Sequence, residues 1–142
     1  VISNGRVIVR RNVGFDQELV ALDASTGDEI WQVVLPGQPF STPAAANGLI
    51  LVACRGGELL ALDQKTGAPV WQISNPQIGS APTVTGTRAY LSTWSGVLAI
   101  DIASGEIVWE MQQGLPNAEQ RPFVIDGKIL VMLADGSLAA YG

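Results

Sequence analysis

The sequence contains no histidine, and it has only one cysteine. Without histidine, these 142 residues cannot form a Ser-His-Asp triad, a Cys-His pair, or a zinc or haem site that uses imidazole. With a single cysteine, Cys54, the chain can form neither an internal disulfide nor a thiolate metal cluster. Because Cys54 lies in an apolar run, we interpret it as a buried and unreactive thiol.

Positive charge is scarce as well. The chain has 8 Lys and Arg against 13 Asp and Glu, which gives a net charge of -5. Nucleic-acid binding usually needs a basic stripe, and membrane-surface binding needs a polybasic patch, so both are excluded as main functions. No apolar run reaches the roughly 20 residues of a transmembrane helix, yet 47% of residues are hydrophobic. Such a composition supports a sizeable buried core.

Helical periodicity is missing too, and an internal repeat stands in its place. Ala, then Leu or Ile, then Asp precede a Thr-Gly or Ser-Gly pair and a Trp, three times along the chain. The tryptophans lie 40 and 38 residues apart, close to the period of about 40–45 residues of four-stranded propeller blades. The repeated positions are Asp23, Gly27, Trp31, Asp63, Gly67, Trp71, Asp101, Gly105 and Trp109.

Each repeat predicts four short strands. In the second repeat these are residues 44–46, 49–54, 58–62 and 69–73, with Asn47-Gly48 as a two-residue hairpin turn. Pro69 suits an outer edge strand, where a missing N–H costs little. The next hairpin turn is expected at residues 55–57, and at Gly96 and Asp135-Gly136 in the later repeats.

The fold class is therefore predicted as all-β, a β-propeller segment with blades of four antiparallel strands. It comprises three full blades plus three strands of a fourth, as part of a seven- or eight-bladed ring. The predicted blades cover residues 1–43, 44–82, 83–122 and 123–142. An open half-ring exposes an apolar blade face, so it calls for self-association or for completion by a missing N-terminal half.

The repeated residues have structural roles in this prediction. The Asp accepts hydrogen bonds from the N–H groups of the following turn, and the Gly supplies the positive φ of that turn. The Trp packs on the neighbouring blade and donates its indole N–H to a backbone acceptor. The remaining acids of the first blade are expected to be solvent-exposed, namely Asp16, Glu18, Asp28 and Glu29.

The motif A-[LI]-D-x-x-[TS]-G-x-x-x-W resembles the PQQ-like repeat of quinoprotein-like propellers. The end of the chain, with Arg121-Pro122 and residues 124–131 and 134–138, is similar to the C-terminal half of the BamB family of outer-membrane β-barrel assembly lipoproteins. This resemblance implies a non-catalytic scaffold and a protein partner, such as the outer-membrane assembly machinery. It also implies a periplasmic or outer-membrane-associated location. In that family a strand from the N-terminus completes the last blade.

Two other functions stay open at this point. One is a fragment of a quinone-dependent alcohol or sugar dehydrogenase, and the other is the sensor propeller of a signalling protein. Such dehydrogenases use an adjacent cysteine pair, a carboxylate base and calcium ligands. This chain has one cysteine and no Asp-rich loop of the D-x-D-x-D type. We therefore predict no catalytic, cofactor-binding or metal-binding residues, and no cofactor, within these residues.

Loops on a rigid propeller often carry recognition, so residues outside the repeat are the candidates for partner contact. An inserted segment, residues 11–17, lengthens the first hairpin, and Trp94 occupies a turn where other blades have small or polar residues. A polar blade-to-blade connection, residues 112–121, is a third candidate. The predicted contact residues are Arg10, Arg11, Phe15, Trp94 and Arg121.

Overall fold

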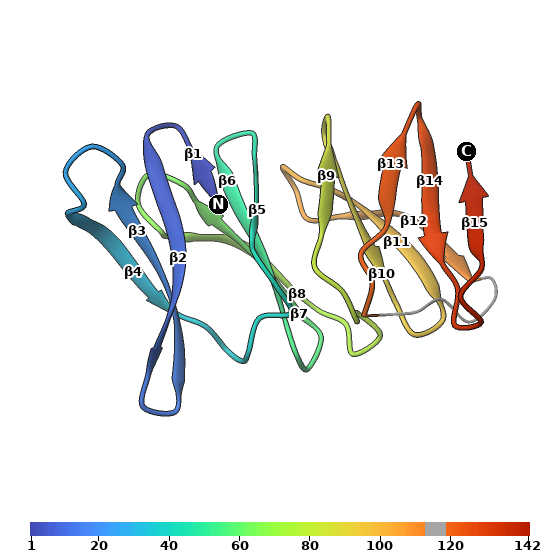
Figure 1. Cartoon of the computed structure of the whole chain (residues 1–142), viewed down its shortest axis with the longest axis horizontal. Helices are drawn as coiled ribbons and strands as arrows, with labels where there is room; N and C mark the ends of the chain where they lie inside the picture. Colours follow the sequence, from blue (N-terminus) through green and yellow to red (C-terminus); the bar gives the residue numbers. More distant parts are fainter. Residues whose placement is uncertain (113–118) are drawn as a thin grey trace.

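The structure of the protein is a computed structural model, described for residues 1–112 and 119–142. Within these two ranges the chain forms fifteen strands and no helix, so no described helix could cross a membrane. The strands make four antiparallel sheets, each from consecutive strands (Figure 1). Three of these sheets have four strands and the last has three, which confirms the predicted propeller architecture.

The sheets follow one another along the chain, and each lies inside one of the four predicted blade ranges. Sheet 1 contains β1 (Ile2–Ser3), β2 (Arg6–Val13), β3 (Asp16–Asp23) and β4 (Glu29–Val34). Sheet 2 contains β5 (Ala44–Ala46), β6 (Leu49–Cys54), β7 (Glu58–Asp63) and β8 (Pro69–Ser74). Sheet 3 contains β9 (Thr83–Thr85), β10 (Arg88–Ser92), β11 (Gly96–Asp101) and β12 (Ile107–Gln112). Sheet 4 contains β13 (Phe123–Ile125), β14 (Lys128–Met132) and β15 (Leu138–Tyr141).

The middle strands are apolar because both of their faces are covered. In β6, Ile50 and Val52 pack toward sheet 1, whereas Leu51 and Ala53 pack toward sheet 3. A strand buried on both faces needs a continuous apolar run, and this is the pattern of β6. The outer strand β8 begins at Pro69, at the sheet edge where no ladder hydrogen bond is lost.

Two-residue turns join the first and second strands of the sheets. Asn47 and Gly48 have φ values of 52° and 77°, as a type I′ hairpin turn requires. Gly96 was predicted in the next turn of sheet 3, and this was wrong. Gly96 begins β11, and it has no positive φ. A Cβ atom at Gly96 would collide with the Met111 carbonyl oxygen, so the close approach of β12 explains this glycine.

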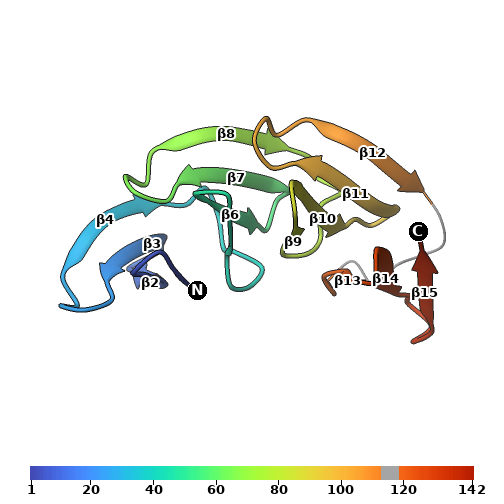
Figure 2. The same ribbon diagram turned by 90° about the horizontal axis from the view of Figure 1, so that it is seen from above.

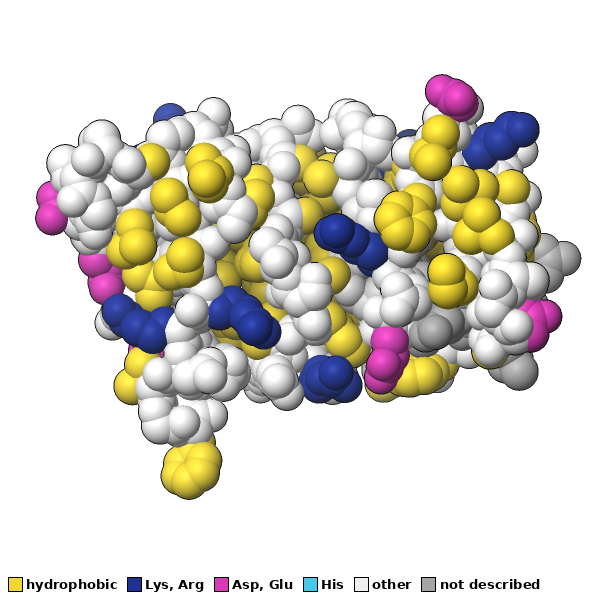
Figure 3. All heavy atoms as spheres, viewed as in Figure 1, with side chains coloured by type: hydrophobic (Ala, Val, Ile, Leu, Met, Phe, Trp, Pro, Cys, Tyr) yellow, Lys and Arg dark blue, Asp and Glu magenta, His cyan; other side chains and the backbone are white. Residues whose placement is uncertain are grey.

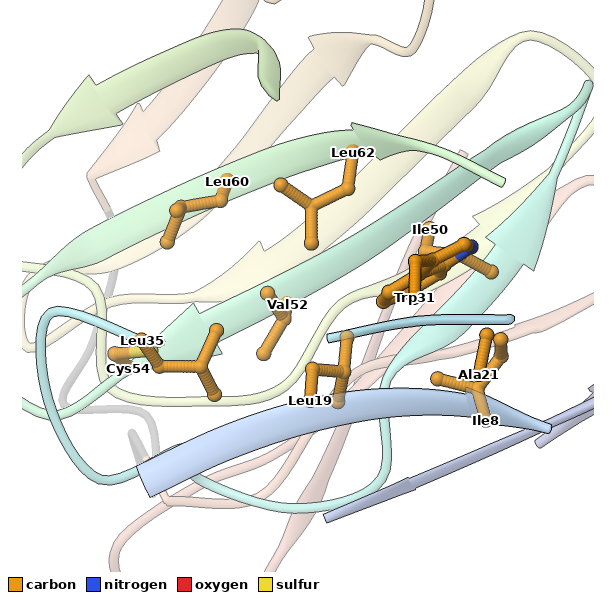
Figure 4. Packing of buried hydrophobic residues seen from close by; sticks show 10 residues of the cluster. All are labelled: Ile8, Leu19, Ala21, Trp31, Leu35, Ile50, Val52, Cys54, Leu60 and Leu62. Carbon is orange, nitrogen blue, oxygen red and sulfur yellow. The ribbon is translucent and has the colours of Figure 1, made fainter. Parts of the chain in front are cut away.

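The four sheets stand face to face along an arc. Seen from above, the outer strands β4, β8 and β12 follow the convex side, and β9 and β13 lie on the concave side (Figure 2). Apolar side chains fill the space between neighbouring sheets, as Figure 4 shows for sheets 1 and 2. There, Ile8 and Leu19 of sheet 1 meet Val52 and Leu60 of sheet 2. The core is thus a series of layers between sheets, because a single blade cannot bury both of its faces.

Trp31 on β4 and Trp71 on β8 each tie their sheet to the next one. The Trp31 indole N–H donates to the Gln64 carbonyl oxygen at 3.1 Å, and the Trp71 N–H donates to the Ile102 carbonyl at 2.9 Å. Each acceptor directly follows the repeated Asp of the next sheet. The Trp31 ring lies against Gly67, where a Cβ atom would come within 2.7 Å of the ring. We call this combination of hydrogen bond and ring-on-glycine contact the indole clasp.

The clasp makes Gly67 intolerant of any side chain. Gly67→Ala would place a methyl group against Trp31 and would also strain a φ of +74°. We expect it to lower the free energy of unfolding by about 2–5 kcal/mol, measured by urea denaturation. The matched control is Gly27→Ala, because Gly27 has a φ of +80° but nothing within 4 Å of the added Cβ atom. In the control, the free energy of unfolding should fall only by the backbone strain of about 1–2 kcal/mol. Equal decreases in the two variants would refute the indole clasp.

Candidate functional site

Antiparallel topology sorts the connections of the chain onto two opposite rims. The turns between first and second strands and those between third and fourth strands share one rim, which we call the turn rim. The turns between second and third strands and the connections from sheet to sheet share the other, which we call the loop rim. In Figure 1 the β13–β14 turn lies at the upper, turn rim, and the β2–β3 and β14–β15 turns lie at the lower, loop rim.

The repeated aspartates lie on the turn rim, where turn hydrogen bonds engage their carboxylates. Asp63 Oδ1 accepts from the N–H groups of Lys65 and Thr66, both at 2.9 Å, and from the Thr66 hydroxyl at 3.0 Å. These bonds, the Thr66 backbone N–H foremost, hold the pKa of Asp63 below its usual range. Asp23 and Asp101 staple their own turns in the same way, and their pKa values are likewise lowered.

These turn hydrogen bonds engage the carboxylates that could otherwise bind a metal ion. In residues 1–112 and 119–142, no three Cys, Asp or Glu side chains gather closely enough to hold an ion. A carboxylate that accepts hydrogen bonds from its own turn is already directed away from the convergent geometry that calcium needs. The described residues therefore offer a fold staple at each repeated Asp.

The lowered pKa of Asp63 makes its contribution to stability depend on pH. The charged carboxylate is favoured in the folded chain, so its contribution is present near neutral pH and is lost as the pH falls below about 4. We expect Asp63→Asn to be less stable than the wild type at pH 7, with a difference that shrinks at pH 3. Urea denaturation at both pH values measures this. Asp16→Asn, on the exposed hairpin, controls for the change in net charge, and a pH-independent difference for Asp63→Asn would contradict the assignment.

Three predicted contact residues from distant parts of the chain lie on the loop rim. Phe15 forms the tip of the β2–β3 hairpin and is fully exposed, with a relative accessibility of 105%. Trp94 lies in the β10–β11 turn and is 54% exposed. Arg121 lies in the connection to sheet 4 and is exposed as well. Of the predicted contact segment 112–121, residues 113–118 lie outside the described part of the chain.

Arg10 and Arg11 lie at successive positions of β2 and so point to opposite faces of sheet 1, whereas Phe15 lies at the hairpin tip. Arg10 reaches the Pro39 carbonyl oxygen at 3.5 Å, at the base of the hairpin. Arg11 lies on the face of sheet 1 that points away from sheet 2. There it contacts Glu18 and Glu29, both at 2.8 Å, and also Gln32. The hydrogen bond to Glu18, followed by that to Glu29, raises the pKa of Arg11.

The expected exposure of Glu18 was also wrong, since this side chain is only 9% exposed. Arg11 and Glu18 are direct cross-strand partners in the β2–β3 ladder, where opposite charges stabilise each other. Counting back from the hairpin turn would have revealed this pairing in the sequence. Arg11 is thus held within its own sheet, and Phe15 and Trp94 are the stronger contact candidates.

The loop rim also contains a contact that sequence reasoning missed. Phe40, in the connection between sheets 1 and 2, carries the Arg55 guanidinium over its ring at 5.4 Å from the centroid. Beside it is a hollow of about 210 Å³ lined by Phe40, Ser41, Ala81, Glu119, Gln120 and Arg121. Three sheet-to-sheet connections therefore converge on one place. An aromatic residue in a proline-rich connection was the available signal.

Cys54 is fully buried at the end of β6, next to the loop rim. Burial raises the pKa of its thiol to about 11, because the thiolate would lose its hydration. We expect the native chain to react with a thiol reagent at pH 8 about a hundredfold more slowly than the urea-unfolded chain. Absorbance of the released chromophore measures the rate. Equal rates in the two states would show that Cys54 is accessible.

The comparisons with known proteins agree with this architecture. The family model for the outer membrane protein assembly factor BamB matches residues 15–142. BamB of Moranella endobia (strain PCIT) is 27% identical over 159 residues, which cover 98% of this chain and 41% of the relative. BamB of Yersinia pestis is 28% identical over 146 residues, covering 90% of this chain and 37% of the relative. The chain thus spans about two fifths of the length of these curated relatives.

Solved structures give the same picture. The crystal structure of BamB from Moraxella catarrhalis matches with a TM-score of 0.82 and 25% identity, over 96% of this chain and 42% of that one. A europium-containing methanol dehydrogenase matches with a TM-score of 0.65 and 23% identity, over 83% of this chain and 25% of that one. The computationally designed Ika4 protein matches with a TM-score of 0.79 and 13% identity, over 99% of this chain and 86% of that one.

The last two likenesses concern the fold alone. The family model, in contrast, covers nearly the whole chain, including the repeated Asp, Gly and Trp positions from Asp23 onward. The architecture, the indole clasp and this match lead to one conclusion: the chain belongs to the BamB family of outer membrane protein assembly factors.

Proposed function

We propose that this chain is part of a non-catalytic scaffold for outer-membrane protein assembly, and that its loop rim contacts a protein of the assembly machinery. The observation that carries the proposal is the position of Phe15 and Trp94 on one rim of a chain of this family. Both are large aromatic side chains on turns, and exposed aromatics are frequent hot spots of protein interfaces.

The loop rim is also a stable platform. The Phe40 N–H donates to the Ala53 carbonyl oxygen at 2.9 Å, and the Arg55 N–H donates to the Gln38 carbonyl at 2.7 Å. The Trp94 N–H donates to the Gln77 carbonyl at 2.9 Å. The β6–β7 and β10–β11 turns are thus each tied to a sheet-to-sheet connection. Loops that are already ordered lose less conformational entropy on binding, which favours affinity.

The side-chain chemistry supports a scaffold over an enzyme. The repeated aspartates are consumed by turn hydrogen bonds, and Cys54 is buried. The sequence offers no histidine as a general base. Together with the names of its relatives, this supports the proposal that the protein works in the periplasm or at the outer membrane.

A binding measurement with rim-specific variants tests the proposal. The chain would be immobilised and exposed to the purified outer-membrane protein assembly machinery of its own source organism. We expect saturable binding that Phe15→Ala and Trp94→Ala each weaken by about tenfold or more, because each removes an exposed aromatic side chain that the partner would bury. Biolayer interferometry gives the dissociation constants.

The matched control is Lys65→Ala, an exposed change on the turn rim that should leave binding unchanged. Loss of binding in the control to the same extent would place the contact elsewhere. Absence of binding by the wild type would refute the scaffold proposal. Tight uptake of pyrroloquinoline quinone with calcium, seen by the absorption of the quinone, would favour a dehydrogenase fragment.

A further inference from the structure

Three arginines surround one short segment of the loop rim. The segment is Pro39-Phe40, in the connection between sheets 1 and 2. Arg10 reaches the Pro39 carbonyl oxygen at 3.5 Å, and the Arg55 guanidinium lies over the Phe40 ring. Arg121 lines the hollow of about 210 Å³ together with Phe40. We call Arg10, Arg55 and Arg121 the arginine cluster, and all three residues are exposed.

The fold leaves the arginine cluster without carboxylate partners. Every ion pair among the described residues involves Arg11, which contacts Glu18 and Glu29 on the opposite face of sheet 1 from Arg10. None of the three cluster arginines forms an ion pair within residues 1–112 and 119–142. The sequence between these two ranges contains no acidic residue. The chain thus neutralises Arg11 and leaves the positive charge of the cluster uncompensated.

The acidic residues closest to the arginine cluster do not cancel its charge. Glu58, which begins the strand after the β6–β7 turn, accepts hydrogen bonds from the Gln72 amide and the Ser74 hydroxyl, both at 2.8 Å. Its carboxylate is therefore held by the outer strand of its own sheet. Glu119 also lines the hollow. Three arginines against one free acid leave this place positive, in a chain whose net charge is -5.

The surface shows the same uneven distribution of charge. In Figure 3, Lys and Arg side chains gather on the lower half of the face shown, toward the loop rim, whereas Asp and Glu side chains lie mostly toward the two ends. Like charges that gather without counter-charges repel each other and reduce stability. Departures of this kind from the most stable arrangement are typical of functional sites.

The backbone holds the arginine cluster in place. Arg10 lies within the β2–β3 ladder, and Arg55 lies in the turn that is hydrogen-bonded to the connection between sheets 1 and 2. Arg121 is fixed on both sides. The carbonyl oxygen of the residue before it accepts from the buried Ser92 hydroxyl at 2.7 Å, and that of the residue after it accepts from the Thr83 hydroxyl. Groups that are ordered before binding lose less entropy on binding.

We infer that the arginine cluster binds an acidic segment of the protein partner, with Asp or Glu side chains as the recognised groups. A guanidinium group matches a carboxylate in geometry and can form two parallel hydrogen bonds with it. The acidic chain as a whole repels an extended polyanion such as a nucleic acid or an anionic lipid surface. A short acidic segment, in contrast, meets only the local charges within a Debye length of about 8 Å. The inference rests on the proposed function and names the chemistry of the surface that the loop rim recognises.

Binding to the same purified assembly machinery tests the inference, by biolayer interferometry at about 50 mM and about 500 mM salt. Arg10→Gln, Arg55→Gln and Arg121→Gln should each raise the dissociation constant about fivefold at low salt, and the triple variant about a hundredfold. At high salt these differences should shrink, because ions screen exposed charges. Circular dichroism identical to the wild type shows that the variants are folded.

The matched control is Lys128→Gln, which removes one exposed positive charge on the turn rim. It should leave the dissociation constant unchanged at both salt concentrations. If the wild type binds and the arginine variants lose no more affinity than this control, the inference fails and the proposed function stands. If the wild type does not bind at all, the proposed function fails and the inference fails with it.

Vesicles of phosphatidylglycerol are the second probe, since guanidinium groups also recognise phosphate. We expect no binding of the wild-type chain to these vesicles in a sedimentation assay. Vesicle binding that the triple variant loses would assign the arginine cluster to a lipid surface and overturn the inference of an acidic protein segment.

Discussion

The indole clasp is the interaction on which the arrangement of the sheets depends. Apolar layers can slide, because hydrophobic contact has no preferred direction. A hydrogen bond from Trp31 to Gln64, with the ring fixed on Gly67, has one geometry. It sets where a sheet lies on its neighbour, and the same construction recurs at Trp71. The Asp staple contributes indirectly, because it shapes the turn that presents both the carbonyl and the glycine.

Much of the sheet arrangement was predictable from one sequence. The indole clasp depends on Asp, Gly and Trp at fixed spacing, and few other structures require these residue types to recur together. The strands of sheet 2 appear almost at their predicted bounds, since two-residue turns and apolar runs fix them locally. Gly96 was misplaced because a glycine marks either a turn or a close approach, and only the packing of β12 distinguishes the two. The burial of Glu18 needed the strand register, which counting back from the β2–β3 turn would have supplied.

The exposure of the aromatic turn residues was predictable, but their position on a common rim was not. Phe15 and Trp94 stood out as aromatics in turns, yet 79 residues separate them in the sequence. Phe15 and Trp94 share a rim because strand direction reverses at each successive strand. After four strands the chain has returned to the same side, so equivalent turns of different sheets lie on one rim. The ion pairs of Arg11 were not apparent from the sequence. An exposed guanidinium and one that bridges two carboxylates look alike in sequence, and only the geometry of Glu18 and Glu29 separates them.

The two rims differ in how much their lengths vary. On the turn rim, each turn between a first and a second strand has two residues, and each turn that follows a repeated Asp has five. On the loop rim, the β2–β3 hairpin has eight-residue strands, and the sheet-to-sheet connections are unequal in length. The turns have fixed lengths on the turn rim, where the indole clasp is formed. The connections vary in length on the loop rim, which takes no part in the clasp. Evolution, or a protein engineer, can therefore lengthen or exchange segments on one side without a penalty in architecture. Such a molecule is suited to acquiring new recognition loops, because its binding specificity and its construction are encoded at opposite ends of the same strands.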